Sequence, residues 1–256
     1  MPSMSDWPVL SLQDSQAGGI DSDGGFGQYA AVSDFMLHKI SDNISDKHAA
    51  MVEMFSIGFH ACNRAGVKES DCVAIFGGGR IGHSILQAAR TKTRETIFVI
   101  DVLPTRLKIA EDAFGNVITI NARQQDPVDV IESHTKGRGV DIAFEAVGQA
   151  KKIKGQKHPV AQCGQVVRSA GIVCVLGQGS EPVELLMRQL IWKEIKLITS
   201  RVSCGEFTEV IEHLEAGNLK PDAIISCEMP ASEAQKAFEL LENQPENYLK
   251  ILLQLG

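Results

Sequence analysis

Val73-Ala74-Ile75-Phe76-Gly77-Gly78-Gly79-Arg80-Ile81-Gly82 is the stretch that decides the fold of this 256-residue chain. It predicts a short apolar strand that runs into a G-x-G-x-x-G turn, and then a helix from His83 to Arg90. A second apolar strand, expected over residues 96–101, ends on Asp101, about twenty positions after the glycines. This combination is typical of a unit that binds a dinucleotide at the end of its first strand.

The glycines of this motif are the first candidate cofactor contacts. Gly77 permits a tight turn out of the strand, Gly79 lets a pyrophosphate approach the backbone, and Gly82 lets the helix pack close to the sheet. The helix start at Arg80 offers free N–H groups and the positive end of its dipole to phosphates. The alternative is a turn that only joins a strand to a helix, because glycine-rich turns are common.

Asp101 and Arg106 predict which dinucleotide is preferred. A carboxylate at the position of Asp101 accepts hydrogen bonds from the hydroxyls of the adenosine ribose and repels a 2′-phosphate, so NAD is favoured over NADP. Arg106 lies one turn into the next expected helix. It could cover the adenine or weaken the preference for NAD.

The composition narrows the class of protein. The chain is 44% hydrophobic with a net charge of −7 and lacks a lysine or arginine run, which argues against a nucleic-acid partner. It has no apolar stretch of membrane-spanning length, and residues 1–12 lack the basic region of a secretory signal. Six scattered cysteines predict buried thiols in a reducing cytoplasm rather than a disulfide framework.

Apolar strands alternate with amphipathic helices from Asp71 onward, which predicts an α/β fold. The expected strands are 72–76, 96–101, 117–120, 140–145, 172–176, 194–199, 223–227 and 249–254. The expected helices are 80–91, 104–113, 126–134, 157–167, 205–216 and 231–242. Such alternation indicates a doubly wound parallel sheet with helices on both faces, the Rossmann fold. Before it we expect a loose arm over 1–25, a strand over 26–32, and a buried helix that Ser45 caps and Gly66 ends.

Several further stretches of the chain, together with the glycine turn and Asp101, resemble motifs of a known family and occur in the same order as in that family. They are Gly24-Gly25-Phe26-Gly27-Gln28-Tyr29, Glu53, His60-Ala61-Cys62, Ala65-Gly66-Val67, Gly137-Arg138-Gly139-Val140-Asp141, Glu145-Ala146-Val147-Gly148 and Ser200-Arg201. From about Gly24 to the C-terminus the sequence resembles the medium-chain dehydrogenase/reductase superfamily. The closest branch is the zinc-type dehydrogenases of the sorbitol and threonine dehydrogenase kind.

The resemblance implies further cofactor contacts at the ends of the later strands. Ile81 would contact the pyrophosphate and ribose. The others would lie near the nicotinamide: Val147, Gly148, Leu176, Gly177, Gln178, Ser200 and Arg201. For each of them the alternative is a residue that only ends a buried strand.

The sequence departs from the family at its N-terminal side. Family members begin with a GroES-like catalytic domain that supplies Cys and His ligands to zinc, and no cysteine or histidine precedes Gly24 here. Zinc is therefore expected from the family, but its ligands have no counterpart. Glu53 matches a position beside the zinc and is our candidate catalytic residue, although catalytic zinc needs about three protein ligands. His60 and Cys62 are two apart on a helix, and we expect them to be packing residues.

These features divide the chain into three expected segments. Residues 1–45 would be a loose arm and a remnant of the GroES-like β domain, and residues 46–230 the Rossmann domain with its connecting helix. Residues 231–256 would form a C-terminal helix and strand that return toward the remnant. Because the catalytic domain is mostly missing, we expect an exposed apolar patch around the strand 26–32 and the helix 46–64, or a partner that covers it.

Two functional hypotheses follow, and a third is weaker. The first is an NAD-dependent oxidoreductase of the zinc-type family, which transfers a hydride between a small secondary alcohol or polyol and nicotinamide. The second is a non-catalytic NAD-binding module or subunit that needs another chain to supply the catalytic domain. A zinc-free reductase is the third. The family also forms homodimers through the edges of its Rossmann sheets, here the segment from Met187 to Ser200 with Ile191, Trp192, Ile195, Leu197 and Ile198.

Overall fold

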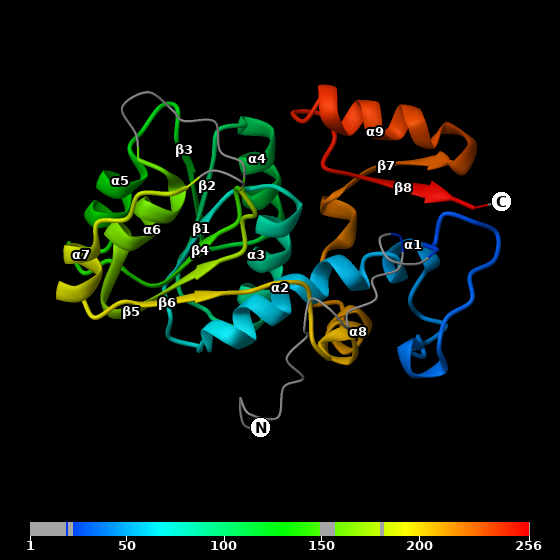
Figure 1. Cartoon of the computed structure of the whole chain (residues 1–256), viewed down its shortest axis with the longest axis horizontal. Coiled ribbons are helices and arrows are strands. Elements are labelled where there is room, and N and C mark those ends of the chain that lie inside the picture. The colour runs from blue at the N-terminus through cyan, green and yellow to red at the C-terminus, as the bar shows by residue number, and fades with distance from the viewer. Residues whose placement is uncertain (1–18, 20–22, 149–156, 180–181, 256) are drawn as a thin grey trace.

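The computed structural model of the chain describes residue 19 and residues 23–148, 157–179 and 182–255. Six strands form one parallel sheet in the order β3-β2-β1-β4-β5-β6, which is the order of a Rossmann fold (Figure 1). The strands are β1 (Val73–Phe76), β2 (Ile97–Asp101), β3 (Val117–Asn121), β4 (Val140–Glu145), β5 (Val167–Val175) and β6 (Lys196–Thr199). Strand order reverses between β1 and β4, so the expected doubly wound sheet is confirmed.

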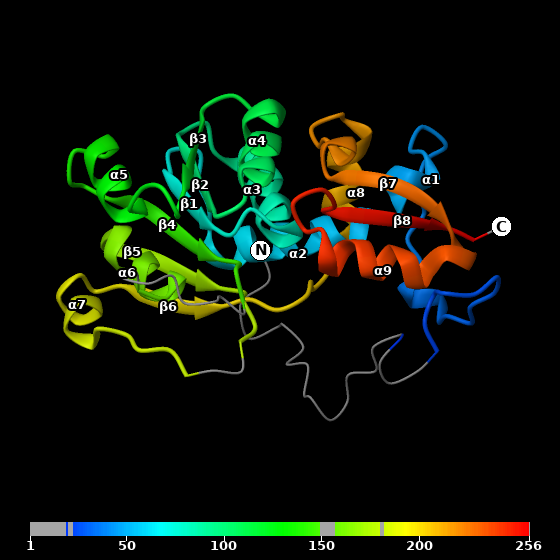
Figure 2. The ribbon, with the colours of Figure 1, turned by 90° about the horizontal axis from the view of Figure 1, so that it is seen from above.

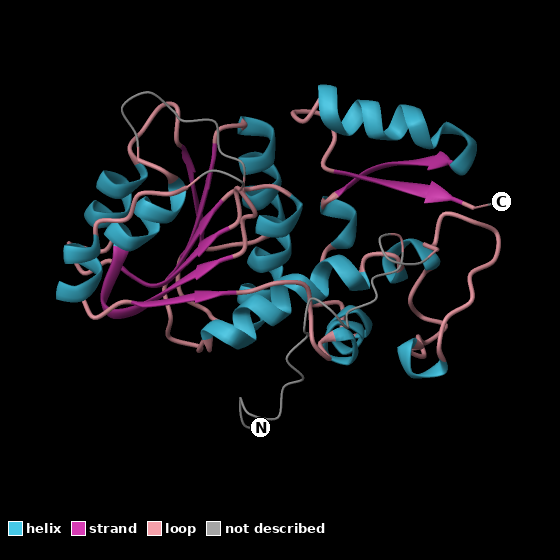
Figure 3. Ribbon diagram, in the orientation of Figure 1, coloured by secondary structure: helices cyan, strands magenta, loops and turns pink. Residues whose placement is uncertain are grey.

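Helices cover both faces of this sheet (Figure 3). One face carries α2 (Val52–Ala65), α3 (Arg80–Lys92), α4 (Pro104–Ala113) and α8 (Phe207–Glu215). The other face carries α5 (Pro127–His134) and α6 (Pro159–Val166). Alternate residues of one strand enter the two cores: Val73 and Ile75 face α2 and α3, whereas Ala74 and Phe76 face α6. Because both faces of the central strands β1, β2 and β4 are buried, these strands are mostly apolar, which makes their sequence pattern clear.

Close packing between α2 and α3 fixes α2 beside the ends of the strands. A side chain at Gly58 would lie 2.3 Å from the backbone of Ser84, so the two helices approach through a glycine. The Ser84 hydroxyl donates to the Met54 carbonyl (2.7 Å) and accepts from the Gly58 N–H (3.0 Å). The first turns of α2, which carry Glu53, are thereby held at the same side of the sheet as the glycine turn.

A separate two-stranded parallel sheet lies next to the Rossmann sheet (Figure 2). Its strands are β7 (Ile225–Pro230) and β8 (Lys250–Gln254), and α9 (Ala234–Asn243) connects them. The short elements that remain are η2 (Asp34–Met36), α1 (Asp46–Ala49), α7 (Met187–Trp192), η3 (Pro221–Ala223) and η4 (Ala231–Glu233). Because β7 pairs with β8, the division expected at residue 230 runs through this unit rather than in front of it.

The expectation of a strand in the N-terminal part is wrong. Residues 26–32 are not a strand: they form bends and irregular backbone, and Tyr29 is 94% exposed. A strand needs a hydrogen-bonded neighbour, and no described strand pairs with this segment. The described part of the expected GroES-like remnant thus has no strand, although the Phe26 ring contacts Phe238 of α9 with centroids 6.3 Å apart. Residues 1–18 and 20–22 of the expected arm lie outside the described residues.

The expected helix after Ser45 is real but broken into α1 and α2. The Ser45 hydroxyl accepts from the His48 N–H, and Gly66 ends α2 in the left-handed conformation (φ +66°), as predicted. The apolar patch was expected partly on this helix, and that part is wrong, because α2 is buried in the core. Exposed apolar side chains of this region lie instead on the segment before it: Phe26, Tyr29, Val32, Met36 and Leu37.

Candidate functional site

The glycine turn after β1 has the geometry that its sequence predicts. Gly77 has φ +106°, and a Cβ there would lie 2.8 Å from the Ala146 carbonyl oxygen. A Cβ at Gly82 would lie 1.7 Å from the Gly77 carbonyl oxygen. Both positions therefore require glycine, one for its backbone conformation and one for the contact between α3 and the turn.

Gly79 differs from these two because the space above it is open. It is the N-cap of α3 with ordinary extended backbone, and the only neighbour of a Cβ there, among the described atoms, would be Arg106 Nη1 at 3.6 Å. The N–H groups of a helix point toward its N-terminal end, so those of the first turn of α3 point toward this space. They have no partner within the helix. The arrangement suits an anion such as a phosphate.

The carboxylate of Asp101 lies at the end of β2 beside the turn. Its Oδ2 accepts from the Gly78 N–H (2.7 Å), and its Oδ1 accepts from the N–H groups of Val102 (2.7 Å) and Leu103 (2.9 Å). Arg106 Nη1 is 3.6 Å from Oδ2, and the Arg106 Nε is buried with no partner among the described residues. Asp101 and Arg106 thus place one negative and one positive charge side by side next to the glycine turn.

Two adjoining cavities follow the carboxyl ends of the strands. The first, about 280 Å³, lies over the glycine turn and is lined by Gly77, Gly79, Arg80, Ile81, Asp101, Arg106, Ala146, Val147, Leu241, Tyr248 and Leu249. The second, about 400 Å³, is lined by Glu53, Ile57, Ile81, Ala146, Val147, Gly148, Leu176, Gly177, Gln178, Ser200, Arg201 and Val202. Ile81, Ala146 and Val147 line both, so the cavities form one cleft across the strand ends.

This cleft brings together almost all the residues that the sequence singled out. Gly82 is the exception, since it packs under the turn instead of lining the cleft. Sequence reasoning missed Ile57 on α2, Val202 after β6, and Leu241, Tyr248 and Leu249 from the C-terminal unit. The sequence gives little indication that these residues belong to the cleft, because the C-terminal ones reach it only when the chain returns from α9 to β8.

Comparison with known protein families identifies the family of this chain. The zinc-binding dehydrogenase family matches residues 81–216, from the glycine turn through α8. The chain belongs to the zinc-binding dehydrogenases. The expected resemblance to zinc-type medium-chain dehydrogenases is therefore confirmed.

Sorbitol dehydrogenase of Bacillus subtilis is 28% identical over 231 residues, which are 90% of this chain and 64% of that enzyme. A solved alcohol dehydrogenase (rspB) from Escherichia coli CFT073, complexed with NADH, superimposes with a TM-score of 0.82 at 24% identity, covering 94% of this chain and 68% of that one. A zinc-binding dehydrogenase from Sinorhizobium meliloti 1021 bound to NADP gives 0.81 at 24%, covering 93% and 68%. These two share the fold with this chain, which spans about two-thirds of the length of each relative.

The described residues of this chain do not supply a zinc site. No group of three His, Cys, Asp or Glu side chains in residues 19, 23–148, 157–179 and 182–255 could hold a metal ion. Glu53 lines the second cavity from α2, but no Cys or His lines it. The donor set that a catalytic zinc needs is thus not met here, and we derive no step through a metal.

His60, which we expected to be a packing residue of its helix, makes a buried polar contact. Its Nδ1 lies 2.8 Å from Oε1 of Glu206, and both side chains are about 95% buried. One turn further along α2, Arg64 Nε donates to the Thr199 carbonyl (2.8 Å). Helix α2 therefore holds both ends of the segment 199–206, which carries Ser200, Arg201 and Val202 into the cleft.

Two observations make this segment a candidate part of a ligand site. The Ser200 hydroxyl is buried with no hydrogen-bond partner among the described residues. Val202 has φ +56°, a conformation that is strained for a β-branched residue. Buried unpartnered hydroxyls and strained residues concentrate where a ligand completes the structure.

Lys250, at the start of β8, brings a cation near the same cleft. Burial lowers the pKa of its amine, the nearby Arg80 lowers it further, and Glu53 opposes the change. Arg80 and Glu53 both line the cleft. Sequence reasoning missed this residue as well, because nothing in its local sequence distinguishes it from any other lysine at the start of a strand.

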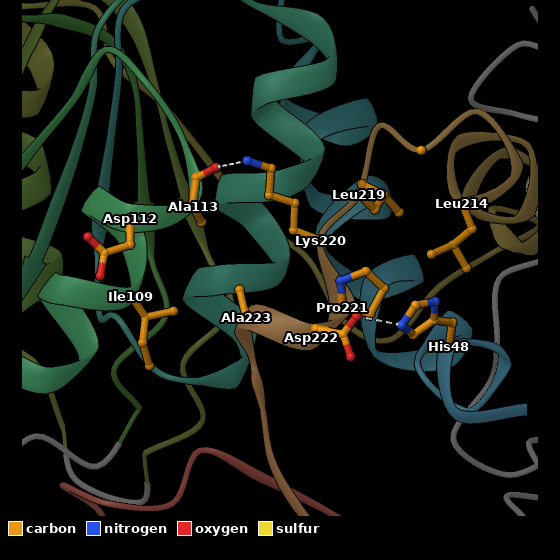
Figure 4. Close-up of a pocket in the computed structure, with 11 residues that line it drawn as sticks. His48, Ile109, Asp112, Ala113, Leu214, Leu219, Lys220, Pro221, Asp222 and Ala223 are labelled. Carbon is orange, nitrogen blue, oxygen red and sulfur yellow. Dashed lines mark hydrogen bonds and ion pairs between the residues drawn. The ribbon is translucent and has the colours of Figure 1, made fainter. Parts of the chain in front are cut away.

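A larger cavity, about 610 Å³, lies away from the strand ends, between α4 and the segment 214–223 (Figure 4). His48 Nε2 is 2.9 Å from Asp222 Oδ2, and Lys220 donates to the Ala113 carbonyl. These polar groups on its wall are already paired with each other. Size alone does not make this cavity the functional site. The smaller cleft at the strand ends, which is lined by residues with unpartnered polar atoms, is the better candidate.

Proposed function

We propose that this chain binds NAD in the cleft and serves as the cofactor-binding part of an alcohol or polyol oxidoreductase. One observation carries the proposal: Gly79 at the open N-terminus of α3, Asp101 and Arg106 all line one cavity, which continues across the strand ends. The unpartnered Ser200 hydroxyl at the far end supports it.

The cofactor fits the cleft in one direction. The pyrophosphate would lie at the start of α3 near Arg80, and the adenosine ribose would donate to Asp101. The nicotinamide half would lie in the second cavity, against residues from the ends of β4, β5 and β6: Val147, Gly148, Leu176, Gly177, Gln178, Ser200 and Arg201. Ile81 would contact both halves. When bound, NAD supplies a ring that accepts a hydride from an alcohol carbon.

NAD rather than NADP is the proposed cofactor. A 2′-phosphate on the adenosine ribose would approach the buried carboxylate of Asp101, and two like charges in a partly buried site repel each other strongly. Arg106 already lies beside that carboxylate at 3.6 Å, which reduces its capacity to pair with a phosphate. One structural relative contains NADH and another contains NADP, so the preference rests on Asp101.

The proposed reaction is hydride transfer between a secondary alcohol or polyol and nicotinamide, by analogy with relatives such as sorbitol dehydrogenase. The part of this chain that faces the nicotinamide can position the ring and exclude water. Glu53 is the proposed polar residue on the substrate side. The alternative, an NAD-binding module without turnover, is favoured by the lack of a metal-ligand cluster among the described residues.

Calorimetric titration with NADH and NADPH tests the proposal. We expect binding at about micromolar affinity for NADH, near −8 kcal/mol, and weaker binding of NADPH. Asp101→Ala should abolish the NADH signal, whereas Asp112→Ala on the exposed side of α4 should not change it. No binding at millimolar cofactor would contradict the proposal. Assay of the chain with a panel of polyols, with and without added zinc, separates the oxidoreductase from the binding module.

A second copy of the chain is the proposed partner. Exposed apolar side chains gather on α7, the segment before it and the edge strand β6: Leu186, Met187, Ile191, Trp192 and Leu197. Ile195 and Ile198, also expected in the contact, pack partly against the core instead. An unpaired strand edge beside an apolar helix suits a symmetric sheet-to-sheet contact.

We propose a reducing compartment, the cytoplasm, as the location. All six cysteines are free thiols, and three of them are fully enclosed by the core. Burial raises the pKa of the Cys174 thiol to about 12, which keeps it protonated and unreactive. No helix in the described part of the chain is long and apolar enough to span a membrane.

A further inference from the structure

Glu145 is a buried carboxylate at the centre of the strand ends. It is the last residue of β4, and its side chain is 1% exposed. Its Oε1 accepts from the N–H groups of Val147 (2.8 Å) and Gly148 (3.2 Å). The charge is therefore balanced by backbone dipoles, and no described lysine, arginine or histidine pairs with it.

The carboxylate lies directly beneath the floor of the second cavity. A Cβ at Gly177 would meet Glu145 Oε2 at 2.4 Å, so the other oxygen of the carboxylate touches the turn after β5. The Glu145 carbonyl also accepts from the N–H groups of Leu176 (2.8 Å) and Gly177 (3.1 Å). Gly148, Leu176 and Gly177 all line the cavity, and one layer of small residues separates the charge from it.

We propose that the Glu145 carboxylate makes this cleft favour the oxidised cofactor over the reduced one. The inference rests on the proposed function, which places the nicotinamide in the second cavity. The ring of NAD⁺ carries a positive charge, and the ring of NADH carries none. A fixed negative charge under the ring attracts the first and not the second, and the two cofactors are otherwise nearly the same ligand.

The other charges at this cavity do not cancel the effect. Glu53 and Arg201 line it with opposite signs, and both are exposed to solvent, which screens them. Lys250 does not line this cavity, and Glu53 favours the charged form of its amine, which raises its pKa against the larger effect of burial. Glu145 acts through protein instead of water, so its interaction is the least screened of these.

Removal of one charge across a single residue layer, at the permittivity of a partly buried site, changes a binding constant by about tenfold. The affected quantity is the ratio of the two dissociation constants, Kd(NAD⁺)/Kd(NADH). A residue that only shapes the loops would weaken both cofactors together and leave this ratio unchanged. The ratio therefore separates a charge effect from a structural one.

The test compares Glu145→Gln with Glu145→Asp, using calorimetry for NAD⁺ and NADH fluorescence for NADH. Glutamine removes the charge and keeps the shape, so the ratio should rise about tenfold, mainly through weaker binding of NAD⁺. Aspartate keeps the charge and shortens the side chain, so both affinities can fall but the ratio should stay within about twofold of that of the unmodified protein.

Each outcome decides the inference. An unchanged ratio in Glu145→Gln, with both cofactors still bound, overturns it and leaves the proposed function intact. An unmodified protein that binds neither cofactor overturns the proposed function and this inference with it. Glu145→Met is a second neutral variant. If neither neutral variant folds while Glu145→Asp does, Glu145 is a structural residue and the inference fails.

Discussion

The Gly78 N–H donates a 2.7 Å hydrogen bond to Oδ2 of Asp101. This contact joins the residue expected to select the ribose to the turn expected to hold the pyrophosphate. A change at Asp101 therefore acts on cofactor choice and on the shape of the turn together, and the two effects need separate measurements.

Asp101→Asn should reduce the discrimination between NADH and NADPH by about tenfold, because the amide no longer repels a 2′-phosphate. Stability should fall by about 1–2 kcal/mol, since an amide that replaces one carboxylate oxygen cannot accept from both sides of the turn. Calorimetry with the two cofactors and urea denaturation measure the two effects. Asp112→Asn, on the exposed side of α4 and outside the cleft, is the control. A variant that keeps full discrimination would show that Asp101 does not face the ribose.

Gly82→Ala and Gly79→Ala should separate folding from binding. The first places a Cβ 1.7 Å from the Gly77 carbonyl oxygen and should destabilise the protein by about 3 kcal/mol or more. The second meets only Arg106 Nη1 at 3.6 Å and has ordinary backbone angles, so stability should change by less than about 0.5 kcal/mol. We expect Gly79→Ala nevertheless to lose most NADH affinity, because its methyl group occupies the space of the phosphates.

Urea denaturation and NADH titration of the two variants provide the measurement. A stable Gly79→Ala that binds NADH as well as the unmodified protein would show that the phosphates do not cross this residue. A Gly82→Ala variant of unchanged stability would show that α3 can move away from the turn without cost.

His83 should make stability fall in mild acid. Burial lowers the pKa of this imidazole to about 4 from its usual 6.5, although its hydrogen bond to the Arg106 carbonyl (3.1 Å) opposes the change. The unfolded chain takes up a proton near pH 6.5, before the folded chain does, so the contribution is complete above that pH and is lost as the pH falls toward 4. The expected loss from this group is about 2 kcal/mol between pH 8 and pH 5.

Urea denaturation at both pH values should show this loss in the unmodified protein. His83→Gln can still donate to the Arg106 carbonyl but cannot titrate, so its loss between the two pH values should be about 2 kcal/mol smaller. Other groups titrate in the same range, and the difference between the two proteins removes them. Equal losses would mean that the pKa of His83 is not lowered in the folded protein.

Parts of this site were predictable because their causes are local. The conformation of Gly77, the contact of Gly82 and the position of Asp101 at a strand end all follow from one strand-turn-helix-strand unit. The failure at residues 26–32 has the opposite cause: an alternating pattern permits a strand, but only a neighbouring strand can pair with it. Tyr248 and Leu249 belong to the cleft through the return of the chain from α9, which no local pattern encodes.

The pair of His60 and Glu206 shows the same limit. Both residues are buried and lie 2.8 Å apart, although 146 residues separate them in the sequence. In its local sequence His60 has the pattern of a packing residue, because nothing near it in the sequence identifies Glu206 as its partner. Glu145 was missed for a different reason: it was present in a matched stretch, but its importance lies in burial beneath Gly177, which only the structure shows.

Breaking the pair should destabilise the protein. Glu206→Ala and His60→Ala should each cost about 3 kcal/mol, since each removes the hydrogen bond between these two buried side chains. The double variant should cost less than the sum, with a coupling of about 1–3 kcal/mol, which a urea denaturation cycle measures. NADH affinity should fall in each single variant, because Glu206 helps to hold the segment that carries Ser200. Additive effects would show that the two groups do not interact in solution.

Association through α7 and β6 is testable by size. Trp192 is 75% exposed, with Arg188 stacked over its ring, and Ile191 beside it is also exposed. Ile191→Glu would place a like charge against its own copy in a symmetric contact, so we expect a concentration-dependent dimer to become a monomer in sedimentation velocity. The folded stability of the monomer should change by less than about 0.5 kcal/mol, because the side chain is exposed. Phe238→Glu, which places the same charge on exposed α9, is the matched control and should leave the dimer intact. If the unmodified chain is a monomer at all concentrations, or if both variants dissociate it equally, this surface is not where two copies meet.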